Sequence, residues 1–337
     1  MFFCVLAASS VRARAQGDVR LSGVVRTQQG IPVPAATIRA EDVSTHSAWV
    51  LDAYFTGTKG THLDMQLAPH GLPPGSPLAA TGTNLNGFIY DTSAANSIYN
   101  AAHLMVRKRS THGPMMLGDY ALGKSIDDAS TIGGGTAVVV QNDADIAAER
   151  GLSSFDIRQQ LRGFFFYQLS SGTTQRWLRG GWGERLLGNY RLNGVLTMNS
   201  GTPFTAHILG AATNNTATGA RFPLRADQIA GACNGPGTLL EFFNTAAFVP
   251  PPPGQYSDAG RNTICGPGLF NLNLGINRNF IFGRDRQRRL DFRWEVTNLT
   301  NTPDYTGLDT VVNSATYGRV TSVGSMRSAD LALRASF

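Results

Sequence analysis

Two cysteines, Cys233 and Cys265, are the residues in this sequence that point most directly to chemistry. Their spacing fits no zinc motif, and no cluster of further ligands lies near them in the sequence. In an exported chain, an even pair of cysteines is typical of one disulfide across a loop. The sequence therefore predicts a disulfide between Cys233 and Cys265, and two free thiols are the alternative.

The acidic residues and the histidines lack the arrangement that catalysis or metal binding requires. Asp143, Asp145 and Glu149 resemble part of a calcium-binding loop, but the glycine and the residue frame of such a loop are absent. Asp127 and Asp128 are adjacent, so in an extended strand their carboxylates point to opposite faces. The histidines form no H-E-x-x-H motif and are expected to be dispersed loop residues. They are His46, His62, His70, His103, His112 and His207.

These patterns predict that the protein is not an enzyme and that it has no catalytic, cofactor-binding or metal-binding residues. No motif identifies a ligand-binding residue. The net charge is +6, but the basic residues are scattered. The densest basic group, at 284–289, lies between two strand-like runs and is predicted to be a turn. Because nucleic-acid binding needs a basic stripe or interleaved aromatic residues, no nucleic-acid partner is expected.

The beginning of the sequence resembles a targeting signal rather than a membrane anchor. The apolar run at 1–8 is far shorter than the roughly 20 residues that a transmembrane helix requires. Residues 1–15 read as a signal-peptide-like segment, because Ala13 and Ala15 precede Gln16 in an A-x-A cleavage pattern. We therefore expect export, and Cys4 would leave with this segment.

Period-two alternation of apolar and polar residues is the main structural signal. In "FNLNLGINRNFIF" (270–282), apolar side chains occupy one parity and asparagines most of the other. Such alternation predicts a strand with one apolar and one polar face. Only 15% of the residues are charged and 38 are glycine, which suits a β-rich chain with many turns. The eight strand candidates are 47–57, 97–109, 114–123, 158–169, 186–199, 270–282, 290–298 and 329–337.

The length of these runs favours a membrane. Strands in soluble sheets average about five or six residues, whereas a strand that crosses a bilayer needs about 9–11. The predicted connections also alternate between long and short, as in outer-membrane barrels with long external loops. Accordingly, the apolar row of 270–282 would face lipid and its asparagines the lumen, with Arg278 reaching the headgroups. A soluble β-sandwich with unusually long strands is the alternative.

The fold class is therefore all-β, an antiparallel transmembrane β-barrel of about 8–10 long strands. The barrel is either closed, with 47–57 paired to 329–337, or incomplete and open at both edges. Residues 16–46 differ, because they read as two short strands around a Gln-Gln-Gly turn. They are predicted to be the remnant of a small β-sandwich module in front of the barrel region, residues 47–337.

Several segments, in order, resemble TonB-dependent receptors of the Oar-like kind. The resemblance covers roughly residues 47–337, and it extends to "GVVRTQQGIPVPAATI" (23–38), which is similar to the start of a carboxypeptidase-regulatory-like module. The segments are "YFTGTKGTHL" (54–63), "YALGKSIDDAS" (120–130), "AERGLSSFDIRQQL" (148–161), "NSGTPF" (199–204), "FFNTAAF" (242–248), "AGRNTICGPGLFNLNLGINRNFIF" (259–282), "LDFRWEVTNLTN" (290–301) and "LALRASF" (331–337).

This resemblance implies a protein of the cell outer membrane that takes part in substrate uptake. Relatives carry a plug domain inside a longer barrel, so the chain is expected to be an internally deleted or fragmentary receptor with a truncated front module. Outer-membrane lipids and the barrel-assembly machinery are the implied partners, and TonB is a partner only if a plug is supplied elsewhere. Leu331, Leu333 and Phe337 resemble the assembly signal. The alternative function is surface binding or adhesion through long loops, without transport.

Overall fold

The structure is a computed structural model, and part of the chain can be described in it. The described residues are 19–25, 36–42, 47–67, 90–110, 113–130, 140–169, 190–208, 224–252, 255–282 and 288–336. Within them, no helix has both the length and the apolar character that crossing a membrane would require. The helical elements described are two short 3-10 turns, η1 (Ile146–Glu149) and η3 (Thr245–Ala247).

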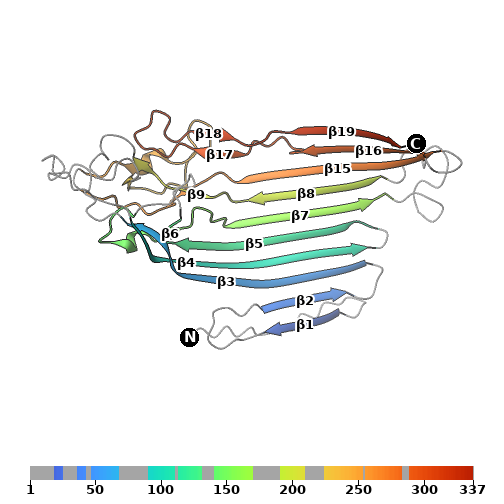
Figure 1. Cartoon of the computed structure of the whole chain (residues 1–337), viewed down its shortest axis with the longest axis horizontal. Coiled ribbons are helices and arrows are strands. Elements are labelled where there is room, and N and C mark those ends of the chain that lie inside the picture. Colours follow the sequence, from blue (N-terminus) through green and yellow to red (C-terminus); the bar gives the residue numbers. More distant parts are fainter. Residues whose placement is uncertain are drawn as a thin grey trace.

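One large antiparallel sheet dominates the molecule (Figure 1). Its strands lie in the order β1-β2-β3-β4-β5-β7-β8-β15-β16-β19, and β6 pairs with the end of β5. The long strands follow one another in the sheet in their chain order, which is a meander, with the short strands β9–β14 (203–265) and β17–β18 (305–323) inserted in two of its connections. The bounds are β1 (Val19–Val25), β2 (Ala36–Asp42), β3 (Ser47–Leu67), β4 (Tyr90–Ser110), β5 (Met115–Asp127), β6 (Gly151–Leu152), β7 (Gln159–Gln168), β8 (Arg191–Asn199), β15 (Leu269–Phe282), β16 (Arg288–Thr297) and β19 (Ser328–Ser336).

The predicted strands are confirmed, but the first two are longer than expected. Both β3 and β4 have 21 residues, so the predicted connection at 59–96 is wrong at both of its ends. Alternation fails there because the pairing of β3 with β4 shifts register between Gly60 and Met65, where His62 adopts φ 57°. Beyond the shift, Met65, Leu67 and Ala95 are buried against Val140 in a small separate core.

The sheet has an apolar face and a polar face, because paired residues of adjacent strands point the same way. On the apolar face, Leu196 of β8 lies opposite Leu272 of β15. Farther along, Ile276 of β15 lies opposite Trp294 of β16, which lies opposite Leu331 of β19. Large side chains of this face remain open, with 41–64% of their surface exposed. They include Trp49, Leu51, Phe55, Leu104, Met116, Leu122, Leu331 and Leu333.

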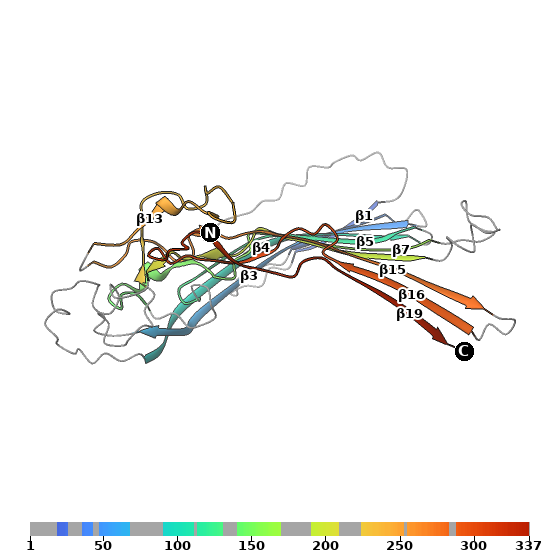
Figure 2. The same ribbon diagram turned by 90° about the horizontal axis from the view of Figure 1, so that it is seen from above.

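The sheet is open rather than closed into a barrel. In the described strands, β1 and β19 stand at its two ends, and β19 pairs with β16 alone. All nine residues of β19 are exposed. Seen from above, the sheet is twisted, and β15, β16 and β19 diverge from the other strands at the end remote from the loops (Figure 2). Of the two predicted arrangements of 47–57 and 329–337, the structure has the open one.

The first two strands extend this same sheet. The strands β1 and β2 form the predicted hairpin, in which Val19 lies opposite Asp42. However, β2 also pairs with β3, where Ile38 lies opposite Ala53. The hairpin is therefore continuous with the long strands, and the division into a front module at 16–46 stays a prediction. The signal-peptide-like segment 1–15, including Cys4, lies outside the described residues.

Long connections gather at one end of the sheet, on the left of Figure 1, and form what we call the loop platform (the described residues of 128–158, 200–208, 224–268 and 298–327). Its core is a cluster of buried apolar side chains that includes Phe243, Phe248 and Ile264. Eight short strands brace the platform in pairs. They are β9 (Pro203–Phe204) with β14 (Ile264–Cys265), β10 (His207–Ile208) with β11 (Leu224–Arg225), β12 (Asp227–Gln228) with β13 (Phe248–Val249), and β17 (Tyr305–Leu308) with β18 (Val320–Val323).

Candidate functional site

A buried arginine joins the loop platform to the sheet. The side chain of Arg261 is 0% exposed, and its Nη2 donates to Asp127 Oδ1 at 2.7 Å, at the end of β5. Its Nε and Nη1 donate to the backbone carbonyls of Glu149 and Ser130, each at 2.6 Å. Since a guanidinium presents its donors in one rigid plane, this single side chain fixes three segments relative to one another.

Glu149 is the second centre of this network. Its carboxylate is 1% exposed and accepts from Arg225 Nη1 at 2.6 Å and from the backbone N–H of Gln141 at 2.9 Å. Gln141 in turn donates to the carbonyl of Ser257 at 2.9 Å. Glu149 therefore does not join Asp143 in a calcium-binding loop. Among the described side chains, no group of three or more His, Cys, Asp or Glu could hold a metal ion.

Further buried hydrogen bonds and one disulfide join other segments of the platform. Asn262 donates from Nδ2 to the carbonyl of Leu152 at 2.6 Å, and its backbone N–H donates to Thr205 Oγ1 at 2.9 Å. Cys233 and Cys265 are joined by a disulfide, with Cα atoms 5.1 Å apart. Buried hydrogen bonds between distant segments favour one arrangement of those segments, although Arg225 Nε, Thr263 Oγ1 and Tyr317 OH are buried without a hydrogen-bond partner among the described residues. The platform is thus a rigid unit rather than a set of independent loops.

One carboxylate of the platform is held in its charged form. Burial acts to raise the pKa of Asp309, but hydrogen bonds from Ser314, Thr316 and the backbone of Val311, with a smaller contribution from His207, outweigh it. The pKa of Asp309 consequently lies below its ordinary value. Ser314 Oγ and Thr316 Oγ1 each donate to Asp309 Oδ2 at 2.6 Å. Asp309 therefore organises the turn between β17 and β18.

The polar face carries a group of ionisable side chains across β3, β4 and β5. Arg107 Nη2 lies 2.5 Å from Asp52 Oδ2, and Asp52 is 8% exposed. Beside this pair, the ring of His103 stacks on Tyr54 with centroids 4.5 Å apart. His103 Nδ1 lies 3.9 Å from Asp119 Oδ1, beyond hydrogen-bonding distance. These groups would line the lumen of a completed barrel.

The asparagines of β15 have structural partners. Asn277 Nδ2 donates to Asn193 Oδ1 of β8 at 3.1 Å, and Asn273 Oδ1 accepts from the backbone N–H of Asn298 at 2.9 Å. An amide both donates and accepts, so neighbouring asparagines can satisfy one another without a net charge. Part of the polar row of this strand is therefore hydrogen-bonded to neighbouring segments, whereas Asn271 Oδ1 is buried without a hydrogen-bond partner in the part of the chain that the structure describes.

Two sequence predictions about individual residues are wrong. Arg278 was expected to reach the headgroups, but it is 5% exposed and its guanidinium lies 4.2 Å from the ring centroid of Phe280 and 4.9 Å from that of Tyr190. Aromatic rings close by offer the cation an attraction that does not require water. The histidines were expected in loops, but those described lie on strands. They are His62, His103 and His207.

Sequence reasoning also missed an apolar patch on the otherwise polar face. Leu117 of β5, Phe164 of β7 and Val195 of β8 lie opposite one another in register. The signal that could have revealed it is the run of three phenylalanines at 164–166, because consecutive residues must occupy both faces.

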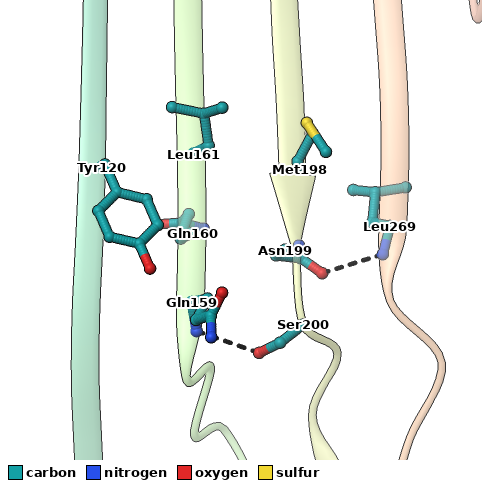
Figure 3. Close-up of a pocket in the computed structure, with 8 residues that line it drawn as sticks. All are labelled: Tyr120, Gln159, Gln160, Leu161, Met198, Asn199, Ser200 and Leu269. Atoms are coloured by element: carbon teal, nitrogen blue, oxygen red, sulfur yellow. Dashed lines mark hydrogen bonds between the residues drawn. The ribbon is translucent and has the colours of Figure 1, made fainter.

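A hollow of about 280 Å³ lies on the sheet where β5, β7 and β8 approach the loop platform (Figure 3). Its apolar walls are Tyr120, Leu161 and Met198, and the ring of Tyr120 fills the space between the β5 and β7 ribbons. At its loop end, Ser200 Oγ accepts a hydrogen bond from the backbone N–H of Gln159 at 3.1 Å. Gln160, Asn199 and Leu269 complete the lining.

A meander of long antiparallel strands with one apolar face, one polar face and large loops at one end defines an outer-membrane β-barrel protein. The model of the outer membrane beta barrel domain family matches residues 43–330, and the chain belongs to this family. No curated protein and no solved structure gave a match. The protein therefore resides in the outer membrane.

Proposed function

We propose that this outer-membrane protein is a TonB-dependent receptor of the Oar-like kind, or the C-terminal part of one, which serves substrate uptake. One observation carries the proposal. Segments that resemble this family in sequence, although far apart in the chain, meet in the buried network of the loop platform. They supply Asp127, Glu149, Arg261 and Asn262. The resemblance therefore concerns residues that interact, and it does not depend on strand composition.

Each part of the molecule has a role in this proposal. The rigid loop platform captures the ligand at the cell surface, because a binding surface works best when its residues are held in place. The polar face lines the path of uptake, and no catalytic step is assigned. Energised transport requires a plug, which would also supply the contact with TonB. Of the proposed assembly signal, Leu331 and Leu333 are exposed, and Phe337 lies outside the described residues.

The experiment is a release assay in liposomes. The purified chain is refolded into phosphatidylcholine liposomes that contain a small self-quenching dye, and folding is checked by the shift between boiled and unboiled samples on a gel. Without a plug, an uptake barrel should release the dye, and adding the plug domain of an Oar-like receptor during refolding should suppress release. Release by folded protein that the plug domain leaves unchanged would contradict the proposal.

A second candidate is surface binding without transport. The observation that favours it is the rigidity of the loop platform, whose disulfide, buried salt bridges and separate apolar core exceed what a pore lining needs. In the same assay, this candidate predicts sealed liposomes that release no dye. Surface binding would be supported if the liposomes release no dye and still retain a glycan or protein ligand on the loop side.

A further inference from the structure

We propose that the hollow between β5, β7 and β8 binds one phosphate-bearing lipid from the leaflet on the loop side. The hollow lies on the apolar face, because Tyr120 and Leu161 are paired in register and so are Leu161 and Met198. This face contacts lipid in the membrane. The inference needs only that placement, and it does not depend on uptake through a TonB-dependent mechanism.

A recess for an acyl chain continues from the hollow toward the turns. The next pair along the same face is Gly118 of β5 opposite Gly163 of β7. A Cβ atom added at Gly118 would meet nothing within 4 Å, so this position is open space. On the far side, the ring of Phe165 covers Gly194 and closes the recess. Missing side chains therefore form a trough with apolar walls, which suits a hydrocarbon chain.

Positive charge stands at the opposite, loop-side end of the hollow. By alternation, Lys124 lies on the same face as Tyr120, two pairs nearer the loops. Arg158 does not share this face, because it lies opposite Gly123, whose N–H donates to the Arg158 carbonyl at 3.0 Å and whose carbonyl accepts from Arg158 Nη1 at 3.5 Å. Lys124 is exposed and supplies the charge at this end of the hollow.

No acidic side chain of the described strands β5, β7 and β8 lies on the apolar face beside Lys124. Lysine and arginine beside a bilayer attract lipid phosphates. The hollow matches the parts of a phospholipid in order. Its apolar walls suit the acyl chain, its polar rim the ester region, and its cationic end the phosphate. Inorganic phosphate would gain nothing from the apolar walls, so we commit to the lipid.

Native mass spectrometry of the full chain in detergent tests the site. The probes are phosphatidylglycerol, a diacylglycerol with the same acyl chains, and inorganic phosphate. Phosphatidylglycerol should be retained at one molecule per chain, with little diacylglycerol and no competition from inorganic phosphate. The variant Lys124→Gln should bind phosphatidylglycerol roughly fivefold more weakly, the effect of one interfacial charge. Lys108→Gln is the matched control, because Lys108 lies on the same face at the other end of the sheet.

A second variant tests the recess separately from the charge. Gly118→Leu should place a side chain in the trough, where its Cβ meets nothing within 4 Å, and weaken phosphatidylglycerol binding while Lys124 remains. Heat-modifiable migration on gels shows that each variant is folded, so a loss of binding is not a loss of structure. Equal retention of diacylglycerol, displacement of the lipid by inorganic phosphate, an equal loss in Lys108→Gln, or full affinity in Gly118→Leu would each overturn the site.

Discussion

Replacing Arg261 by alanine should loosen the loop platform while leaving the sheet folded. The guanidinium is fully buried and donates to the Asp127 carboxylate and to backbone carbonyls of the Asp127, Ser130 and Glu149 segments. Its removal leaves these acceptors buried and short of a donor. The strands of the sheet keep their own backbone ladders, because Arg261 lies outside them.

The size of the effect follows from what remains after the change. Removing one partner of a buried ion pair typically costs about 3–5 kcal/mol. Asp127 still accepts from the N–H of Ser130 at 2.9 Å, and Glu149 keeps Arg225 at 2.6 Å. We therefore expect the lower part of that range, about 3 kcal/mol, which corresponds to roughly a hundredfold loss of protection against local opening.

Hydrogen exchange measured by mass spectrometry, on chain refolded into detergent, checks this. Exchange should accelerate at 140–158 and 255–268 and stay unchanged in β15 and β16. Arg319→Ala is the matched control, because that arginine is on the same platform but is exposed. Adding Asp127→Asn to the variant should recover part of the loss, since no uncompensated charge then remains. If Arg261→Ala and Arg319→Ala exchange alike at 140–158, the reasoning about the buried network is refuted.

Three further predictions concern other parts of the chain. Because hydrogen bonds hold the pKa of Asp309 below its unfolded value of about 4, the stability it contributes is present above that value and lost as the pH falls through the lower folded pKa. Asp309→Asn should remove this acid-dependent step in hydrogen exchange of 305–320, and an identical pH profile would contradict it. Reducing the Cys233–Cys265 disulfide should cost about 2–4 kcal/mol of platform stability, seen as faster proteolysis of 224–268 after dithiothreitol, whereas equal rates would argue against a structural role. Leu272→Arg places a charge on the lipid face and should destabilise the refolded protein by about 2–4 kcal/mol in urea titration, while Asn271→Arg on the polar face should cost much less. Equal costs would mean that the two faces are assigned wrongly.

Strand positions and faces could be predicted from the sequence because alternation is a local property. The alternation of 270–282 shows which face each residue occupies, and the short connection between β15 and β16 favours their pairing. The pairing of β15 with β8 spans the loop platform, so it is a long-range contact. Alternation failed where the ladder itself shifts, near His62 of β3. A register shift depends on the partner strand, so no pattern within one strand can show it.

The buried network of the platform could not be predicted in the same way. Arg261 meets Asp127 across 134 positions and Glu149 across 112 positions of the sequence, in a segment without periodicity. Glu149 seemed to belong with Asp143 and Asp145 because they are close in sequence. In the structure, Glu149 instead pairs with Arg225, because a buried carboxylate requires a cation nearby. Arg278 is similar, because its aromatic neighbour Tyr190 lies on another part of the chain.

The free edge of β19 determines the stage at which copies of the chain are prone to associate. The sequence of β19, SADLALRAS, is its own antiparallel complement about Ala332, so that a second copy would set Asp330 against Arg334 and Leu331 against Leu333. Copies inserted in one direction hold these strands parallel, with like charges side by side, and so cannot join in this way. Chains still in water have no such restriction, and an open edge there invites edge-to-edge association. Insertion into the bilayer therefore prevents this association. Copies are expected to associate through β19 before insertion, while they are still in water.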